Sequence, residues 1–310
     1  MIAVAPAAPL LASTVVLVRQ GKQVIELLMI RRHAHSGFMP NATVFPGGKV
    51  DEVDGDVPIV GKIPHLPGRD KETARAFAVA ALRELHEEAH VLLAVDVRGE
   101  PLQPEELAEF DREIESLRQG RHLAASAWHA ALRARSWRLD VRSLCVFAHW
   151  LTPVNEPKRF DTYFFAAPLP IGQEPALDHH ETTALFFVEA QHALHEHQQG
   201  GETRLPPPTI HTLERFDMLA QRCDHALPAV LDQLRSEGVG PRLMPVHFAV
   251  GTPQWTVALP WDPLVENAQE FIDQHGDQLQ AMTAVAHVRD GRPTCDRFVL
   301  ANERLVRLRD

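Results

Sequence analysis

Three glutamates lie close together in a short segment with the apolar periodicity of a helix. Residues 83–91 read Arg-Glu-Leu-His-Glu-Glu-Ala-His-Val, with Glu84, Glu87 and Glu88 as the acidic members. At 3.6 residues per turn, the three carboxylates share one helix face within an arc of about 100°. Arg83 precedes Glu87 by four residues and can pair with it and orient it. Adjacent carboxylates repel one another unless they are solvated or hold a cation, and all-oxygen ligands favour Mg²⁺ or Mn²⁺. The segment alone leaves a solvated acidic face open as the alternative.

A glycine loop upstream gives this helix a context. Phe45-Pro46-Gly47-Gly48-Lys49 ends a short strand-like run, and its glycines let the backbone approach a metal or a phosphate closely. The loop and the Arg-Glu-Leu-x-Glu-Glu helix together resemble the Nudix box. The resemblance implies an α+β fold, specifically an α/β/α sandwich with a mixed sheet, and Mg²⁺- or Mn²⁺-dependent hydrolysis of a small-molecule diphosphate. It also implies catalytic roles for Arg83, Glu84, Glu87 and Glu88, with Gly48 as a further metal ligand.

Three departures from the box are visible. Gly48 and Arg83 are 35 positions apart, which is 21 more than in the standard box. The glutamate expected eight residues before Arg83 is Arg75, and Glu72, Asp51 or Glu181 are candidates to replace it. The glycine expected after the helix is His90, which would take a left-handed conformation at some cost.

The long insert points to one branch of the family. The chain resembles Nudix proteins similar to the peroxisomal coenzyme A diphosphatase, which share the insert and the lost glutamate. Further matches are Phe38-Met39-Pro40, Arg159-Phe160-Asp161-Thr162-Tyr163-Phe164-Phe165 and Leu205-Pro206-Pro207-Pro208-Thr209. The resemblance covers roughly residues 12–215. It implies coenzyme A or an acyl-CoA as substrate.

Other residues are candidates for binding the substrate or the metal. Glu181 precedes the strand predicted at 184–188, where Nudix proteins often place a loop carboxylate near the metal, and it is a candidate ligand or general base. Arg31, Arg32 and Arg159 could hold phosphates, because a guanidinium matches phosphate oxygens in pairs. Gly47 could contribute its backbone to the same site.

Two other functions remain as alternatives. His86-Glu87-Glu88-Ala89-His90 is a literal H-E-x-x-H, the signature of zinc peptidases, but it lacks a third ligand downstream and leaves the glycine loop without a role. The other alternative is a catalytically silent nucleotide-binding Nudix module, which Arg75 and His90 would favour.

The remaining elements must position these residues. Strands are predicted at 13–18, 25–30, 143–151, 162–167 and 184–188, and helices at 71–89, with Asp70 as N-cap, at 104–135 with a break at Gly120, and at 189–198, 210–222 and 229–236. Residues 49–68 are predicted to be an irregular loop. We expect a Nudix domain over 10–200, with inserts at 49–69 and 100–138, and a C-terminal helical and β extension over 205–310, with strand-like runs at 246–250 and 255–259.

Composition limits the partners. The net charge of −10 argues against a protein that coats nucleic acid, because that function needs a basic face. The three cysteines form no C-x-x-C pair, which favours reduced thiols and a cytoplasmic location. We expect no membrane span and no targeting signal, since Pro6 and Pro9 interrupt the uncharged N-terminal run. A homodimer remains open.

Overall fold

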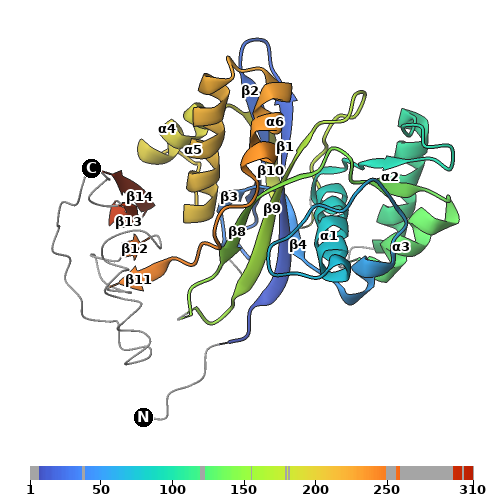
Figure 1. Cartoon of the computed structure of the whole chain (residues 1–310), viewed down its shortest axis with the longest axis horizontal. Coiled ribbons are helices and arrows are strands. Elements are labelled where there is room, and N and C mark those ends of the chain that lie inside the picture. The colour runs from blue at the N-terminus through green and yellow to red at the C-terminus, as the bar shows by residue number, and fades with distance from the viewer. Residues whose placement is uncertain are drawn as a thin grey trace.

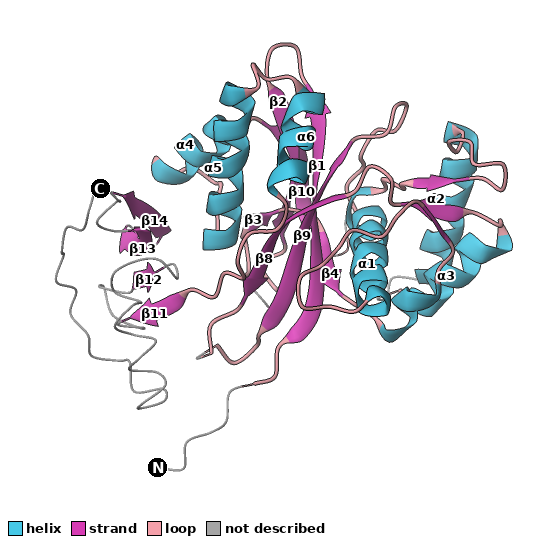
Figure 2. Cartoon of the chain, in the orientation of Figure 1, coloured by secondary structure: helices cyan, strands magenta, loops and turns pink. Residues whose placement is uncertain are grey.

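The centre of the molecule is a seven-stranded mixed sheet. The computed structural model describes residues 7–36, 39–118, 123–154, 156–178, 180, 182–248, 256–258, 296–301 and 304–309. The strand order is β10-β2-β1-β9-β8, with β3 paired to β2 and β4 paired to β1 (Figure 2). The pairing of β1 with β9 is parallel and the other pairs are antiparallel. The strands are β1 (Leu10–Gln20), β2 (Ile25–Arg32), β3 (Thr43–Val44), β4 (Gly47–Lys49), β8 (Cys145–Leu151), β9 (Phe160–Pro168) and β10 (Thr182–Val188).

Helices cover both faces of this sheet (Figure 1). One layer holds α1 (Lys71–Ala89), α2 (Pro104–Arg118) and α3 (Ala125–Ala134), and the other holds α4 (Ala190–Gln198), α5 (Pro207–Arg222) and α6 (Leu227–Glu237). Alternate residues of β1 enter the two cores: Val15 and Leu17 face the first layer, while Val16 and Val18 face the second. The strand therefore reads as a continuous apolar run, as expected for a sheet buried on both faces. The predicted α/β/α sandwich is confirmed.

The helices after residue 205 belong to the sandwich. Ile210, Leu213 and Phe216 of α5 and Val230 of α6 share the second core with the central strands. These helices therefore pack directly on the sheet, although the sequence assigned them to an extension of the Nudix domain. The described part of the C-terminal region forms a four-stranded antiparallel sheet of β11 (Val246–Phe248), β12 (Thr256–Ala258), β13 (Asp296–Ala301) and β14 (Arg304–Arg309).

The helix α1 has the bounds that the sequence predicts. Asp70 caps its N-terminus, accepting a hydrogen bond from the Thr73 amide at 2.7 Å. His90 ends it in the left-handed conformation, with φ 55° and ψ 27°. The His90 ring also lies 3.3 Å from Asp111 of α2, a contact that the box glycine could not make. The strained cap is thus held by a neighbouring helix.

The insert after Gly48 is more ordered than predicted. Instead of one irregular loop, it contains a 3-10 helix, η1 (Glu52–Asp56), and the short strand β5 (Ile59–Val60). Asp51 caps η1, and Asp54 accepts a hydrogen bond from the Asp51 amide at 2.7 Å. The strand β5 pairs with β7 (Arg138–Asp140), which also pairs with β6 (Ala94–Val95). The first insert is therefore joined, through a small second sheet, to the chain segments that flank the second insert.

Several predicted features lie outside the described residues: Phe38, Gly120, Glu181, and residues 249–250, 255 and 259 of the predicted strand-like runs. Cys145 and Cys223 are free thiols. Among the described residues, no helix combines the length and the apolar character needed to cross a membrane.

Candidate active site

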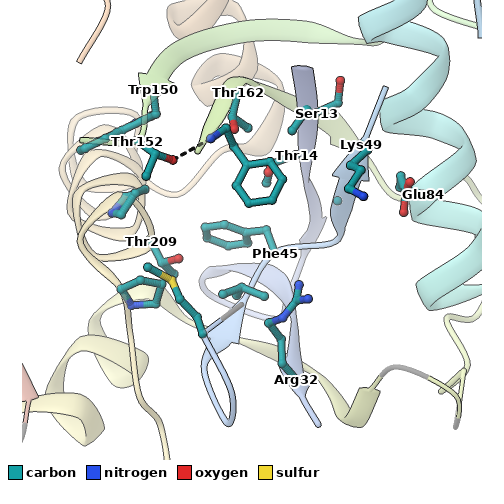
Figure 3. A pocket seen from close by; sticks show the side chains of 18 of the residues that line it. Ser13, Thr14, Arg32, Phe45, Lys49, Glu84, Trp150, Thr152, Thr162 and Thr209 are labelled. Atoms are coloured by element: carbon teal, nitrogen blue, oxygen red, sulfur yellow. Dashed lines mark hydrogen bonds between the residues drawn. The ribbon is translucent and has the colours of Figure 1, made fainter. Parts of the chain in front are cut away.

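A cleft of about 920 Å³ brings the acidic face of α1 and the glycine loop together. Its lining includes Glu84, Glu87 and Glu88, together with Gly47, Gly48 and Lys49. Figure 3 shows Glu84 and Lys49 on one side of the cleft and Trp150 and Thr209 on the opposite side. The cleft therefore runs from an acidic wall to a more apolar one.

The glycine loop lies directly against the catalytic helix. The Gly47 amide donates to Glu88 Oε2 at 2.8 Å, so Glu88 is fixed by the backbone of β4. A Cβ atom on Gly48 would lie 2.4 Å from the Glu84 carboxylate. A Cβ atom on Gly47 would lie 2.4 Å from the Ser13 carbonyl oxygen of β1. Both glycines thus permit approaches that no larger residue allows.

Arg83 organises the other two carboxylates. Its Nη1 donates to Glu84 Oε1 at 2.8 Å and to Glu87 Oε1 at 3.2 Å. Its Nη2 donates to the Lys49 carbonyl at 2.9 Å, which ties the glycine loop to the helix. The predicted pairing of Arg83 with Glu87 is therefore present.

The environment of Glu87 disfavours its ionised form. Burial and the charge of Glu84 raise the pKa of Glu87 to about 7, although Arg83 opposes the shift. In the described part of the chain, no three His, Cys, Asp or Glu side chains are already gathered around one point as metal ligands. Side-chain rotation would have to bring the carboxylates together around a cation. The donor set of carboxylate and backbone oxygens nevertheless fits Mg²⁺ or Mn²⁺.

The H-E-x-x-H pattern has a structural explanation. His86 is buried, its Nδ1 accepts from the Trp128 indole at 2.9 Å, and its Nε2 lies 2.9 Å from Asp111. Burial lowers the pKa of His86, so the neutral ring donates to Asp111. Both ring nitrogens are therefore occupied by the helical insert, and Glu87 faces Arg83 instead. This arrangement gives no support to the zinc alternative.

We expect Trp128→Phe to lower the free energy of unfolding by about 1–3 kcal/mol, because it leaves the buried Nδ1 of His86 without a donor. Urea unfolding at neutral pH measures the effect. The matched control is Trp137→Phe, which removes a buried indole from the same aromatic cluster around Phe110 but keeps the bond to His86. Equal losses in the two variants would show that the hydrogen bond contributes nothing.

Arg75, where the box has glutamate, binds the insert. Its Nε donates to the Gly55 carbonyl at 2.8 Å, and its Nη2 donates to the Val57 carbonyl. A carboxylate still reaches Arg83, but it comes from Asp54 of η1, which sequence reasoning missed. The candidate substitutes Asp51 and Glu72 are both exposed, with Asp51 capping η1 and Glu72 in the first turn of α1.

The three arginines that are candidates for binding phosphate differ in their positions and in their hydrogen-bond partners. Arg32 lines the cleft and is held by two hydrogen bonds to Ser36 Oγ. Arg31 pairs with Glu202 at 2.9 Å. Arg159 is buried and donates to the carbonyls of Thr152 and Ala7. Neither Arg31 nor Arg159 is among the described residues that line the cleft.

Sequence reasoning also missed residues at both ends of the cleft. Arg118, the last residue of α2, lines it and forms a buried ion pair with Asp178. At the apolar end, Phe45, Phe164 and Trp150 line the cleft. Trp150 is nearly buried, and its indole Nε1 has no hydrogen-bond partner among the described residues. The Phe45–Lys49, Arg159–Phe165 and Leu205–Thr209 motifs gave a signal for this wall, but Trp150 lies in none of them.

Comparisons with known proteins agree with this geometry. A solved Nudix hydrolase from Alicyclobacillus acidocaldarius is 30% identical and superposes with a TM-score of 0.57, covering 76% of this chain and 99% of that protein. The putative nudix hydrolase 7 of Caenorhabditis elegans and the acyl-coenzyme A diphosphatase NUDT19 of Xenopus laevis are each 26% identical, over 195 and 226 residues. These matches cover 62% of this chain in both cases, but only 56% and 59% of those relatives. No protein-family model matches the chain. The fold, the glycine loop packed on a glutamate helix and the 30% identity over a whole solved relative show that the chain belongs to the Nudix hydrolase family.

Proposed function

We propose that this protein is a divalent-metal-dependent hydrolase that cleaves the diphosphate linkage of coenzyme A or an acyl-CoA. The observation that carries the proposal is the packing of Glu84 and Glu88 of α1 against the Gly47–Gly48 backbone, with Glu87 in the same cleft and a more apolar wall opposite. A diphosphate placed at the acidic wall would leave the rest of the substrate along the apolar one.

Each residue of the acidic wall has a part in this proposal. Glu84, Glu87 and Glu88, with the Gly48 carbonyl, would hold Mg²⁺ or Mn²⁺, which would neutralise the diphosphate and help to activate the attacking water. Arg83 keeps Glu84 and Glu87 in place, and Gly47 fixes Glu88. The water oxygen forms a bond to one phosphorus, and the bond from that phosphorus to the bridging oxygen breaks. With coenzyme A, the products are 3′,5′-adenosine bisphosphate and phosphopantetheine. Glu181 stays a prediction for the general base.

The residues of the apolar wall favour a substrate that carries a large organic group beside its diphosphate. Phe45, Trp150 and Phe164 offer aromatic faces, and Arg32 and Lys158 line the same cleft with positive charge. The buried indole N–H of Trp150 offers a donor for a carbonyl or amide oxygen of the substrate. The name of the Xenopus relative points to the same class of substrate.

The features that favoured a silent binding module have structural roles instead. Arg75 holds the insert through two carbonyls, and His90 ends α1 beside Asp111. Neither change removes a carboxylate from the acidic wall. The geometry therefore supports hydrolysis over binding alone.

The test is product release from a panel of diphosphates, measured by mass spectrometry with saturating Mg²⁺ and with EDTA. The panel holds coenzyme A, acyl-CoAs, NADH, ADP-ribose and dinucleoside polyphosphates. We expect Mg²⁺-dependent cleavage of coenzyme A or acyl-CoA with the two products named above. Thermal stabilisation by a panel member without any cleavage would instead support the binding module.

A further inference from the structure

We propose that Asp54 is a positioning residue that holds the Arg83 guanidinium and, through it, orients Glu84 and Glu87, and that His129 of the second insert acts through its contact with Asp54. This inference rests on the proposed function, because it assigns the two inserts a part in building that active site. Asp54 is not among the described residues of the cleft lining, so it would act only through Arg83.

The guanidinium of Arg83 is fixed on one edge by Asp54. Nε lies 3.0 Å from Asp54 Oδ1 and Nη2 lies 3.0 Å from Asp54 Oδ2, a paired arrangement of two hydrogen bonds. Because the guanidinium is planar, fixing this edge also fixes the direction in which Nη1 points. Nη1 is thereby directed at Glu84 and Glu87. With the bond to the Lys49 carbonyl, the five N–H donors that an arginine has are matched by five hydrogen bonds.

Asp54 is built into this place rather than resting on the surface. Its side chain is 0% exposed, and that of Arg83 is 4% exposed. Burial alone would raise the pKa of Asp54, but the contacts with His129 and Arg83 outweigh it and hold the pKa below its ordinary value. The carboxylate is therefore ionised at neutral pH, and its charge offsets that of the buried guanidinium.

The second insert also contacts Asp54. His129 of α3 is 1% exposed, and its Nε2 lies 3.0 Å from Asp54 Oδ1. Arg133 of the same helix donates to the Asp56 carbonyl at 3.1 Å, so α3 contacts η1 at both Asp54 and Asp56. The chain of contacts runs from α3 through Asp54 to Arg83, and ends at two carboxylates of the cleft.

The experiment compares Asp54→Asn with the wild-type protein in two measurements. The first is Mn²⁺ binding to the substrate-free protein, followed by electron paramagnetic resonance. The second is steady-state hydrolysis of the best substrate as a function of Mg²⁺. The control is Glu52→Gln, which neutralises an exposed carboxylate on the same 3-10 helix.

We expect Asp54→Asn to weaken Mn²⁺ binding and to lower kcat by about 10- to 100-fold, the usual effect of removing an outer group that orients ligands. The substrate KM at saturating Mg²⁺ should change little, because Asp54 does not line the cleft. Glu52→Gln should match the wild type. In an Arg83→Lys background, Asp54→Asn should add almost nothing, since the residue acts through Arg83.

Unchanged Mn²⁺ affinity and kcat in folded Asp54→Asn would overturn the positioning role while leaving the proposed function standing. If the wild type hydrolyses no diphosphate, the proposed function fails, and Mn²⁺ affinity alone decides the positioning role. If Asp54→Asn does not fold, His129→Gln takes its place, with a smaller loss of Mn²⁺ affinity expected and an unchanged affinity counting against the proposal.

Discussion

Replacing Glu88 by Gln is expected to abolish Mg²⁺-dependent hydrolysis while the fold stays intact. Glu88 is 5% exposed and accepts the Gly47 amide at 2.8 Å. A glutamine oxygen can accept the same hydrogen bond, so the contact between loop and helix survives. The variant loses the negative charge, and with it one cation ligand. Stabilisation by a bound cation is worth several kcal/mol in the transition state, which corresponds to a rate loss of about 10³-fold or more.

The measurement is kcat/KM with Mg²⁺ over a wide concentration range, together with thermal denaturation of the metal-free protein. Glu72→Gln is the matched control, because Glu72 is an exposed carboxylate in the first turn of the same helix. We expect it to keep full activity. Hydrolysis by Glu88→Gln at more than about a tenth of the wild-type rate would remove Glu88 from the metal site, since a lost ligand costs more than that.

The catalytic helix could be predicted because its signals are local. The apolar spacing, Asp70 at the start and His90 at the position of the box glycine that follows the helix all lie within one segment. The structure places the helix at the bounds that these signals indicate. The glycine loop and the glutamates could also be placed together, because the box resemblance joins them. The roles of these residues in catalysis remain predictions.

The contacts that hold Arg83 could not be predicted, because they join residues that are far apart in the sequence. Asp54 precedes Arg83 by 29 positions and lies in a segment whose Pro and Gly content indicated a loop. Its only local signal is the spacing Asp51-x-x-Asp54, which fits a cap of a short helix as well as a functional pair. For Arg31 and Arg159, the residue type alone does not decide the role. A guanidinium suits a phosphate, a carboxylate or a backbone carbonyl equally, and only the fold shows that Arg159 holds two carbonyls.

The two glycines of the loop should give different results when each is changed to alanine. Neither has a positive φ, so an alanine acts through its contacts and not through backbone strain. At Gly48 the new methyl would meet the end of the Glu84 side chain, which can rotate away. At Gly47 it would meet the Ser13 carbonyl oxygen and the Thr14 Cα at 2.4 and 2.8 Å, and these backbone atoms of β1 cannot move freely.

We therefore expect Gly48→Ala to lower kcat/KM by about 100-fold, because displacing a reacting group by about 1 Å has that effect, with little change in stability. Gly47→Ala should instead lower the free energy of unfolding by about 1–3 kcal/mol, the usual cost of overpacking. Urea unfolding and steady-state kinetics on both variants separate the two effects. If Gly48→Ala kept wild-type activity and Mg²⁺ dependence, Glu84 would not need its present place, and the cation would have to be held by Glu87 and Glu88 alone. The pair of variants thus distinguishes Gly48, which leaves space for the Glu84 carboxylate, from Gly47, which leaves space for the backbone of β1.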